Sequence, residues 1–406
     1  MRSVVYAALA VIVLPWAARA QTLSLTEAEA LARLSPDSAR VRALQATIDV
    51  ARADVLAARR WPNPRFTIDR ESVSGLTEYL TMVAQPLAVT GRRGLETEAA
   101  TALVEATANR SDDAIRRARA DLRLAFAQLL VAQTRVRELT STRTRLQELA
   151  NVLAKREAAG DTAGFDRLRA EHEVFEVDAD RAIAGADRAR AQGQVASFFS
   201  TAADVTGVVA VESAAPSSAL PAVDALVERA ESTRGELLAL RKEIDAARFS
   251  ARAADRRLVP EPEIIAGTKS SNLGNGDIGS VVTILASVPI FDRGQPERAL
   301  ALARVRQAEA RNSAFRQTVR TEITALRAIV QERREASERY RFAAVSGVGQ
   351  IERIAQVSYD AGERGISDLL DAYRLASSSR LRQASLELSV REAEIELEFA
   401  SGWEIR

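Results

Sequence analysis

The apolar positions of this chain follow a helical period over unusually long stretches. From residue 95 to residue 158 there is no glycine or proline, and apolar residues recur every seven positions. One series is Ile115, Leu122, Leu129 and Val136, and the series beside it is Ala118, Ala125, Ala132, Leu139, Leu146 and Leu153. This pattern predicts one long helix over 94–158 with coiled-coil packing. Such a helix of about 65 residues is about 95 Å long, so it requires an extended assembly rather than a globule.

A second long helix is predicted over 295–361. Its seven-residue series contains Val305, Val319, Leu326, Tyr340 and Ile354. Shorter helical stretches at 36–60 and 162–199 together nearly equal the first long helix in length. Stacked end to end, they would match it.

Two regions change to the alternating period of strands. In the stretch of about 65–90, Phe66 and Ile68 alternate with polar neighbours, and a turn is expected at Ser74-Gly75. The stretch of about 263–290 contains an Asn- and Gly-rich loop at 272–277, a composition that favours a hairpin turn. Each region therefore predicts one β-hairpin.

The chain is a tandem duplication. Matched residues recur at shifts that run only from 196 to 203, which indicates one unit of about two hundred residues present twice. The matches are Ile48 with Ile244, Pro62 with Pro260, Pro86 with Pro289, Gly160 with Gly362, Asp166 with Asp368, and Leu168 with Leu370. We divide the chain into a first repeat at 21–200, a connector at 201–222, a second repeat at 223–400 and a tail at 401–406.

Each repeat has a glycine-containing turn between two helices, at 159–165 and at 362–366. In the second, Gly362 and Gly365 would supply left-handed or close-approach backbone, and Ser367 or Asp368 would cap the following helix. Asp368 and Asp371 are three residues apart and therefore share a helix face. An isolated turn of this kind would be an ordinary surface hairpin with capping acids, but its recurrence favours a function.

Composition excludes several classes of protein. Residues 1–20 have the pattern of a secretory signal, with Arg2, an apolar core and Ala18-Arg19-Ala20. The formal net charge is +1, which argues against a nucleic-acid partner. The chain has no cysteine and one histidine, His172, which we expect at the surface, so we expect no metal site and no cofactor. Because no nucleophile–base set or phosphate-binding loop occurs, we do not expect an enzyme.

Strands of about 9 to 11 residues can cross a bilayer when tilted. Four strands cannot close a barrel, and open edges in lipid leave backbone groups unpaired, so several chains would have to pool their strands. Three copies would give a barrel of twelve strands, and two or four copies would also give enough strands to close a barrel. Trp61 could anchor at the membrane interface or pack on the helix junction.

The chain resembles the TolC-like family of outer-membrane efflux channels. The resemblance rests on the turn at Tyr359–Ala372 and on the segments Gln85–Arg93 and Val288–Gln295, which look most like the heavy-metal-efflux branch. It implies a mainly helical homotrimer with a twelve-stranded β-barrel in outer-membrane lipid, continued by a periplasmic α-helical barrel. It also implies a passive exit duct for heavy metals or drugs, with a periplasmic adaptor (membrane fusion protein) and an inner-membrane pump of the RND type as partners.

The resemblance further implies residue roles. Tyr359, Arg364, Asp368 and Asp371 match the periplasmic gate, and Tyr359 and Arg364 would bond to Asp166 of the first turn. Phe165 stands where the family often has a hydroxyl residue. The two turns would dock the adaptor through their glycines, Gly160, Gly164, Gly362 and Gly365. The alternative is a soluble periplasmic coiled-coil scaffold or adaptor, although an adaptor would carry one helical hairpin flanked by β-rich domains.

Overall fold

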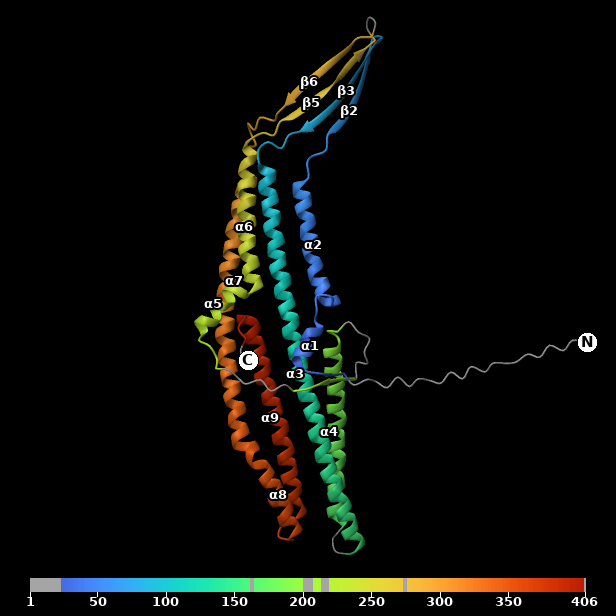
Figure 1. Ribbon diagram of the computed structural model, residues 1–406, viewed down its shortest axis with the longest axis vertical. Helices are drawn as coiled ribbons and strands as arrows, with labels where there is room; N and C mark the ends of the chain where they lie inside the picture. Colours follow the sequence, from blue (N-terminus) through green and yellow to red (C-terminus); the bar gives the residue numbers. More distant parts are fainter. Residues whose placement is uncertain (1–22, 161–163, 200–206, 213–218, 273–275, 405–406) are drawn as a thin grey trace, which may run out of the picture.

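The structure is a computed structural model that describes residues 23–160, 164–199, 207–212, 219–272 and 276–404. The expected signal at 1–20 lies outside these residues, as do most of the connector and part of the turn at 159–165. The molecule is a long helical column with a β-sheet at one end and two helical turns at the other (Figure 1). The sheet and the turns are therefore at opposite ends of the chain's longest dimension.

The first repeat is built along α3, Arg92–Ala158, a single helix of 67 residues. It begins two residues earlier than the sequence predicts. The helix α2, Ala39–Arg59, lies beside its sheet-proximal half, and α4, Gly164–Ala196, lies beside its distal half (Figure 1). The short α1, Glu27–Arg33, begins with a capping box between Thr26 and Glu29.

The second repeat has the same order with one difference. Helices α5, Val223–Thr233, and α6, Gly235–Asp255, are followed by a 3-10 turn at Arg256–Leu258. The long helix predicted over 295–361 is α7, Gln295–Tyr340, then a π-helical segment, Arg341–Val345, then α8, Ser346–Asp360. The weak helix formers Gly347 and Gly349 come directly after the wider π turn. The last helix is α9, Ile366–Ser401.

The sheet contains one hairpin from each repeat. Its strands are β2, Arg65–Val73, β3, Leu76–Pro86, β5, Glu263–Ser271, and β6, Ile278–Leu285, in that order and antiparallel. The first turn has positive φ at Ser74 (54°) and Gly75 (87°), as a two-residue hairpin requires. The strands predicted to reach about 90 and 290 stop at Pro86 and Leu285. Pro86 is the last residue of β3, and it has no N–H to donate to the ladder. The strand β6 ends four residues before Pro289.

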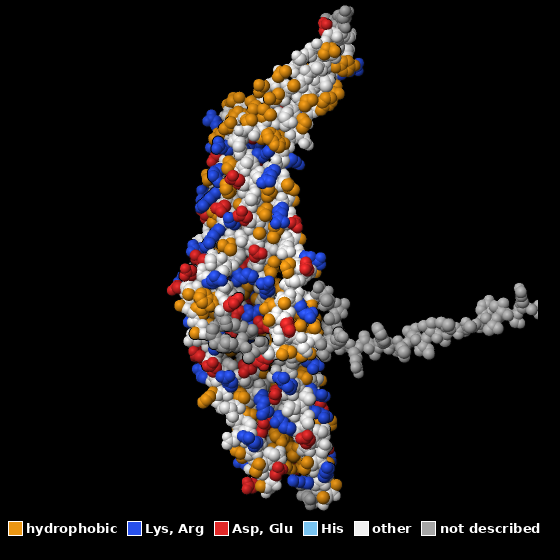
Figure 2. All heavy atoms as spheres, in the orientation of Figure 1, with side chains coloured by type: hydrophobic (Ala, Val, Ile, Leu, Met, Phe, Trp, Pro, Cys, Tyr) orange, Lys and Arg blue, Asp and Glu red, His pale blue; other side chains and the backbone are white. Residues whose placement is uncertain are grey.

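The two faces of the sheet differ in chemistry. Side chains on one face are mostly apolar and exposed, among them Phe66, Ile68, Ile278, Val282 and Ile284 at 61–75% exposure, and apolar side chains cover much of this end in Figure 2. The opposite face carries the charged residues Arg65, Asp69, Glu71, Glu78, Glu263 and Lys269, which include the ion pair between Lys269 Nζ and Glu78 Oε2 at 2.6 Å. The alternation therefore places the charged side chains of the four strands on one face, with the exception of Arg70, which lies on the face of Phe66 and Ile68.

The core is spread along the column in three clusters. One contains Leu122, Phe126 and Leu129 and lies under the short parallel pair of β1, Leu23–Leu25, and β4, Val208–Ala210. A second lies at the turns and a third in the middle of the second repeat. The leucines of the predicted seam in α3 are 0–3% exposed. In the second repeat the predicted series is wrong in part: Val319 is buried, but Ile354 is 53% exposed.

Candidate functional site

The two helical turns at the distal end form the first part of the site. Gly160 and Gly362 have φ of +79° and +73°, a conformation that disfavours any side chain. The N–H of Gly160 donates to Glu157 O at 2.9 Å, and that of Gly362 donates to Tyr359 O at 3.0 Å. Each glycine therefore ends its helix in the left-handed conformation that the sequence predicts for these turns.

The other two predicted glycines behave differently. Gly365 has φ of −79°, and a Cβ there would meet no described atom within 4 Å, so the expectation of left-handed or crowded backbone is wrong for it. The expected caps are also wrong, because α9 begins at Ile366 and Ser367 lies inside its first turn. At Gly164, in contrast, a Cβ would lie 2.4 Å from Glu157 Oε1. Gly164 therefore allows a close approach within the first turn.

Tyr359 is brought into the contact between the two turns. It is 9% exposed and belongs to the cluster that contains Leu153 and Leu369. The guanidinium of Arg156 lies 5.7 Å from the centre of its ring. Burial raises the pKa of Tyr359; the nearby charge of Arg156 opposes the rise, and the negative charge of Asp166 adds to it. The structure thus brings Tyr359 and Asp166 within electrostatic reach of each other.

Arg364 does not reach Asp166 inside one chain. Its Nη1 lies 3.9 Å from Asp368 Oδ2, four residues along the chain, and its side chain is 60% exposed. Asp371 is also exposed and pairs with Arg374 at 3.5 Å. The Arg364–Asp166 bond that the resemblance implies is therefore not made within a protomer, where Arg364, in the turn before α9, lies at ion-pair distance from Asp368.

Glu352 joins the two helical hairpins and was not predicted. Its Oε1 accepts from Nη1 of Arg145 on α3 at 2.8 Å, and its Oε2 accepts from Nη2 of Arg380 on α9 at 2.6 Å. The Glu352 side chain is 11% exposed. The carboxylate of one helix, α8, therefore holds arginines from two others.

A second junction lies nearer the turns. Glu173 of α4 accepts two hydrogen bonds from Arg374 of α9, and the Glu173 side chain is 7% exposed. Arg169 Nη1 of α4 donates to Ser367 Oγ at 2.7 Å. Sequence analysis missed these residues because a charged position on a helix is most often a solvated one. The signal becomes visible only when the two hairpins are known to pack together.

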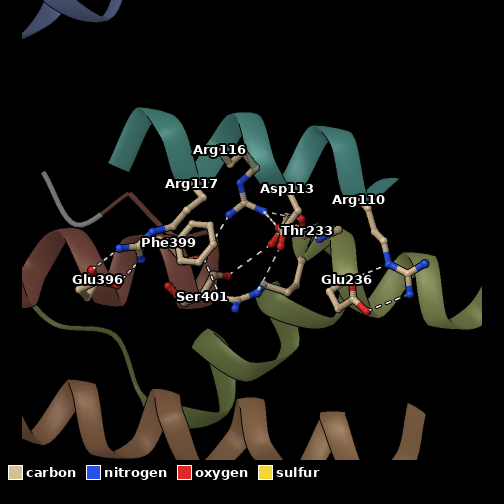
Figure 3. A network of polar contacts seen from close by, with 11 residues as sticks. Arg110, Asp113, Arg116, Arg117, Thr233, Glu236, Glu396, Phe399 and Ser401 are labelled. Atoms are coloured by element: carbon tan, nitrogen blue, oxygen red, sulfur yellow. Dashed lines mark hydrogen bonds and ion pairs between the residues drawn. The ribbon is translucent and has the colours of Figure 1, made fainter. Parts of the chain in front are cut away.

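A third junction links the repeats in the middle of the column (Figure 3). Arg116, Arg117 and Arg234 surround the ring of Phe399, with guanidinium carbons 4.4–5.9 Å from its centre. Asp113 Oδ1 accepts from the N–H of Gly235 at 3.0 Å. Burial lowers the pKa of Arg116, as expected for a cation with little water around it.

Further ion pairs of this third junction connect α3 to α6 and α9. Arg110 Nε bonds Glu236 of α6 at 2.9 Å, and Arg117 Nη1 bonds Glu396 of α9 at 2.7 Å. Gly235 allows close contact with α3, since a Cβ there would lie 2.2 Å from Asn109 O. The two repeats are therefore fastened to one another at mid-column.

Other candidate residues play smaller parts. His172 is exposed, and its Nε2 lies 3.6 Å from Glu176 Oε1 on the same helix. Within the described ranges, no three His, Asp or Glu side chains are grouped as metal ligands would be. Trp61 stacks on Arg93, with the Arg93 guanidinium carbon 4.0 Å from the centre of the Trp61 ring, and Trp61 is 57% exposed. None of the described helices combines the length and the apolar composition that crossing a membrane requires.

Comparison with known proteins places this architecture among outer-membrane proteins. The family model described as outer membrane efflux protein matches residues 226–403. The nickel-cobalt-cadmium resistance protein of Alcaligenes xylosoxydans xylosoxydans is 27% identical over 296 residues, 70% of this chain. The chain spans 64% of that relative's length.

Two further proteins cover more of the chain. The cobalt-zinc-cadmium resistance protein of Cupriavidus metallidurans is 23% identical over 365 residues, which is 88% of this chain and 85% of that protein. The outer membrane channel of Campylobacter jejuni superposes with a TM-score of 0.77 at 12% identity, over 93% of this chain and 85% of that one. The structural likeness shows a shared fold, and the sequence likeness is to metal resistance proteins.

Proposed function

Because residues 226–403 match the family model described as outer membrane efflux protein, we propose that three copies of this chain form the outer-membrane exit duct of a tripartite efflux system. The duct is passive and is not an enzyme. Its sheet end spans the outer membrane, and its helical column extends through the periplasm toward an adaptor and an inner-membrane pump of the RND type. We place the turns at 159–165 and 362–366 at the adaptor.

The open sheet carries this proposal. β2 and β6 are the outer strands, and neither has a partner on its outer side among the described residues. The strands have 8 to 11 residues, close to the length that a tilted strand needs to cross a bilayer. An apolar outer face and a charged inner face suit lipid on one side and water on the other. Three copies of the four-stranded sheet would close a twelve-stranded barrel with no free edge.

The helices also present faces that a neighbouring copy would cover. Within the 21 residues of α2, only Val41 is buried. On α4, Phe165, Leu168, Phe175 and Ile183 are 56–70% exposed and follow a helical spacing. Exposed apolar rows of this extent favour assembly over a soluble single chain.

The gate is the distal end of the duct in this proposal. Around a threefold axis, Asp368 and Asp371 would contribute six carboxylates, which would attract cations. Arg364, which is exposed and only loosely paired with Asp368, would be able to reach Asp166 of a neighbouring copy. Tyr359, already buried beside the first turn, would hold the two turns of one copy together.

We assign divalent transition-metal ions as the substrate. The support is the likeness to two relatives named for resistance to nickel, cobalt, zinc or cadmium. The ions would pass without a dedicated site, since the chain contains no cysteine and a single exposed histidine. Drugs are the competing substrate class.

Deletion in the host tests location and substrate together. Cells without this chain should lose tolerance to nickel, cobalt, zinc or cadmium, and a plasmid copy should restore it. The restored protein should sediment with outer membranes as a heat-modifiable trimer. Loss of drug tolerance alone would reassign the substrate, and recovery as a soluble single chain would refute the duct.

A further inference from the structure

The base of the sheet contains a contact between the two repeats. The segment after β3, Leu87–Gly91, runs along the segment before β5, Val259–Pro262. The N–H of Leu87 donates to Pro262 O at 2.8 Å, and Thr90 Oγ1 donates to Glu261 Oε1 at 2.9 Å. Both segments lie just beyond the end of the β3–β5 ladder, where Pro86 pairs with Glu263. The contact therefore continues the pairing of β3 and β5 beyond the sheet.

The same two segments occur a second time, at the two open edges. Val288–Gly294 follows β6 and repeats the segment after β3, with Pro289, Ile290 and Gly294 in the places of Pro86, Leu87 and Gly91. Trp61–Pro64 precedes β2 and repeats Val259–Pro262, with its two prolines in the same places. Val288–Gly294 lies at the β6 edge of the sheet and Trp61–Pro64 at the β2 edge, so these two segments cannot meet inside one chain.

Exposure distinguishes the joined pair from the separated one. Leu87 and Glu261 are partly buried, and Glu263 is 8% exposed. Their counterparts Ile290, Asn63 and Arg65 are all exposed, and Ile290 reaches 62%. The next residue, Phe291, is 94% exposed. The separated segments thus leave uncovered the surfaces that the joined ones cover.

We propose that Val288–Gly294 of one copy of this chain binds Trp61–Pro64 of the next copy, in the geometry that Leu87–Gly91 and Val259–Pro262 already show within the chain. The proposal rests on the trimer proposed above and specifies its interface. It places Pro289 opposite Arg65 of the adjacent copy, as Pro86 lies opposite Glu263. It also extends β6 past Leu285 toward Pro289, where the sequence predicts strand.

The residues at these positions suit the contact. Ile290 N–H takes the place of Leu87 N–H and would donate to Pro64 O. In the single chain it donates instead to Val288 O, two residues away at 2.9 Å, a local bond that can be exchanged. Asn63 takes the place of Glu261, and Arg293 takes that of Thr90, so an amide oxygen would meet a guanidinium donor.

Cysteine cross-linking tests the interface directly, because the chain has no cysteine of its own. The variant with Asn63→Cys and Arg293→Cys is treated in outer membranes with a short bis-methanethiosulfonate reagent. We expect bands of two and three chains on a non-reducing gel, which collapse to one chain on reduction. As a geometric control, Thr90→Cys with Glu261→Cys should cross-link within one chain without forming these bands.

Two further variants define what would overturn the interface. Each single cysteine variant should give no three-chain band. Asn63→Cys with Phe291→Cys shifts the register by two residues, and if it cross-links better than the first pair, the inherited register is wrong. A three-chain mass by light scattering without the 63–293 cross-link refutes the interface and leaves the trimer standing. A single-chain mass refutes both.

Discussion

Replacing Glu352 with glutamine should loosen the junction between the two hairpins. The substitution keeps the shape of the side chain and removes the charge that holds Arg145 and Arg380. Removing one partner of a fully buried ion pair costs about 3–5 kcal/mol. Here the Glu352 side chain is 11% exposed, but those of Arg145 and Arg380 are 30% and 28% exposed. Solvent screening reduces the expected loss to about 2 kcal/mol.

A loss of about 2 kcal/mol would raise the population of separated hairpins by about 30-fold. Native-state hydrogen exchange should show it as faster exchange in α8 and in the facing part of α3, with the exchange of mid-column amides near Phe126 unchanged. In bilayers the same variant should spend more time in a conducting state. Glu338→Gln, an exposed acid of α7, is the matched control and should change neither measurement.

A double-mutant cycle separates this junction from general destabilisation. Arg145→Gln alone should have an effect similar to that of Glu352→Gln, and the two together should fall short of the sum by about 1 kcal/mol or more. Additive effects would show that the contact contributes no coupling. If the free energy of opening of α8, measured by hydrogen exchange, stays within about 0.5 kcal/mol of the parent value, the reasoning is refuted.

Two further perturbations address the turns. Gly362→Ala should destabilise the second turn by about 1–2 kcal/mol through left-handed backbone strain alone, since no described atom lies within 4 Å of the added Cβ. Gly365→Ala is the control: at φ −79° it should change the midpoint of thermal unfolding little. Burial raises the pKa of Tyr359 above its ordinary value of 10.0. The stability that the neutral phenol contributes to the fold is therefore fully present at neutral pH and is lost as the pH rises through that raised pKa. An alkaline titration of hydrogen exchange at the turns should therefore show a step that Tyr359→Phe removes, and an unchanged step would assign it to another group.

Much of the architecture is readable from the sequence because it depends on repeated local signals. The absence of glycine and proline from 95 to 158 specifies α3, and the alternation around Phe66 specifies a strand. The glycines that end helices are also visible, since Gly160 and Gly362 occupy equivalent places in the two repeats. These features need no knowledge of what packs against them.

Features that depend on packing between distant elements were missed or misplaced. Ser367 has the composition of a helix cap, but its hydroxyl accepts from Arg169 of the other hairpin instead. Glu352 resembles any charged residue of a helix until α3 and α9 are known to lie beside it. Arg364 lies 3.9 Å from Asp368, and its expected contact with Asp166 depends on how the two turns are placed, which the local sequence does not specify.

Single-channel recording of the particle extracted from outer membranes tests the central claim most directly. The three-chain particle should insert into a planar lipid bilayer and give discrete current steps with a preference for cations. Replacing Arg364 with alanine and Tyr359 with phenylalanine should increase the current through each particle. A three-chain particle that inserts and carries no current, with or without these substitutions, would contradict a transmembrane duct.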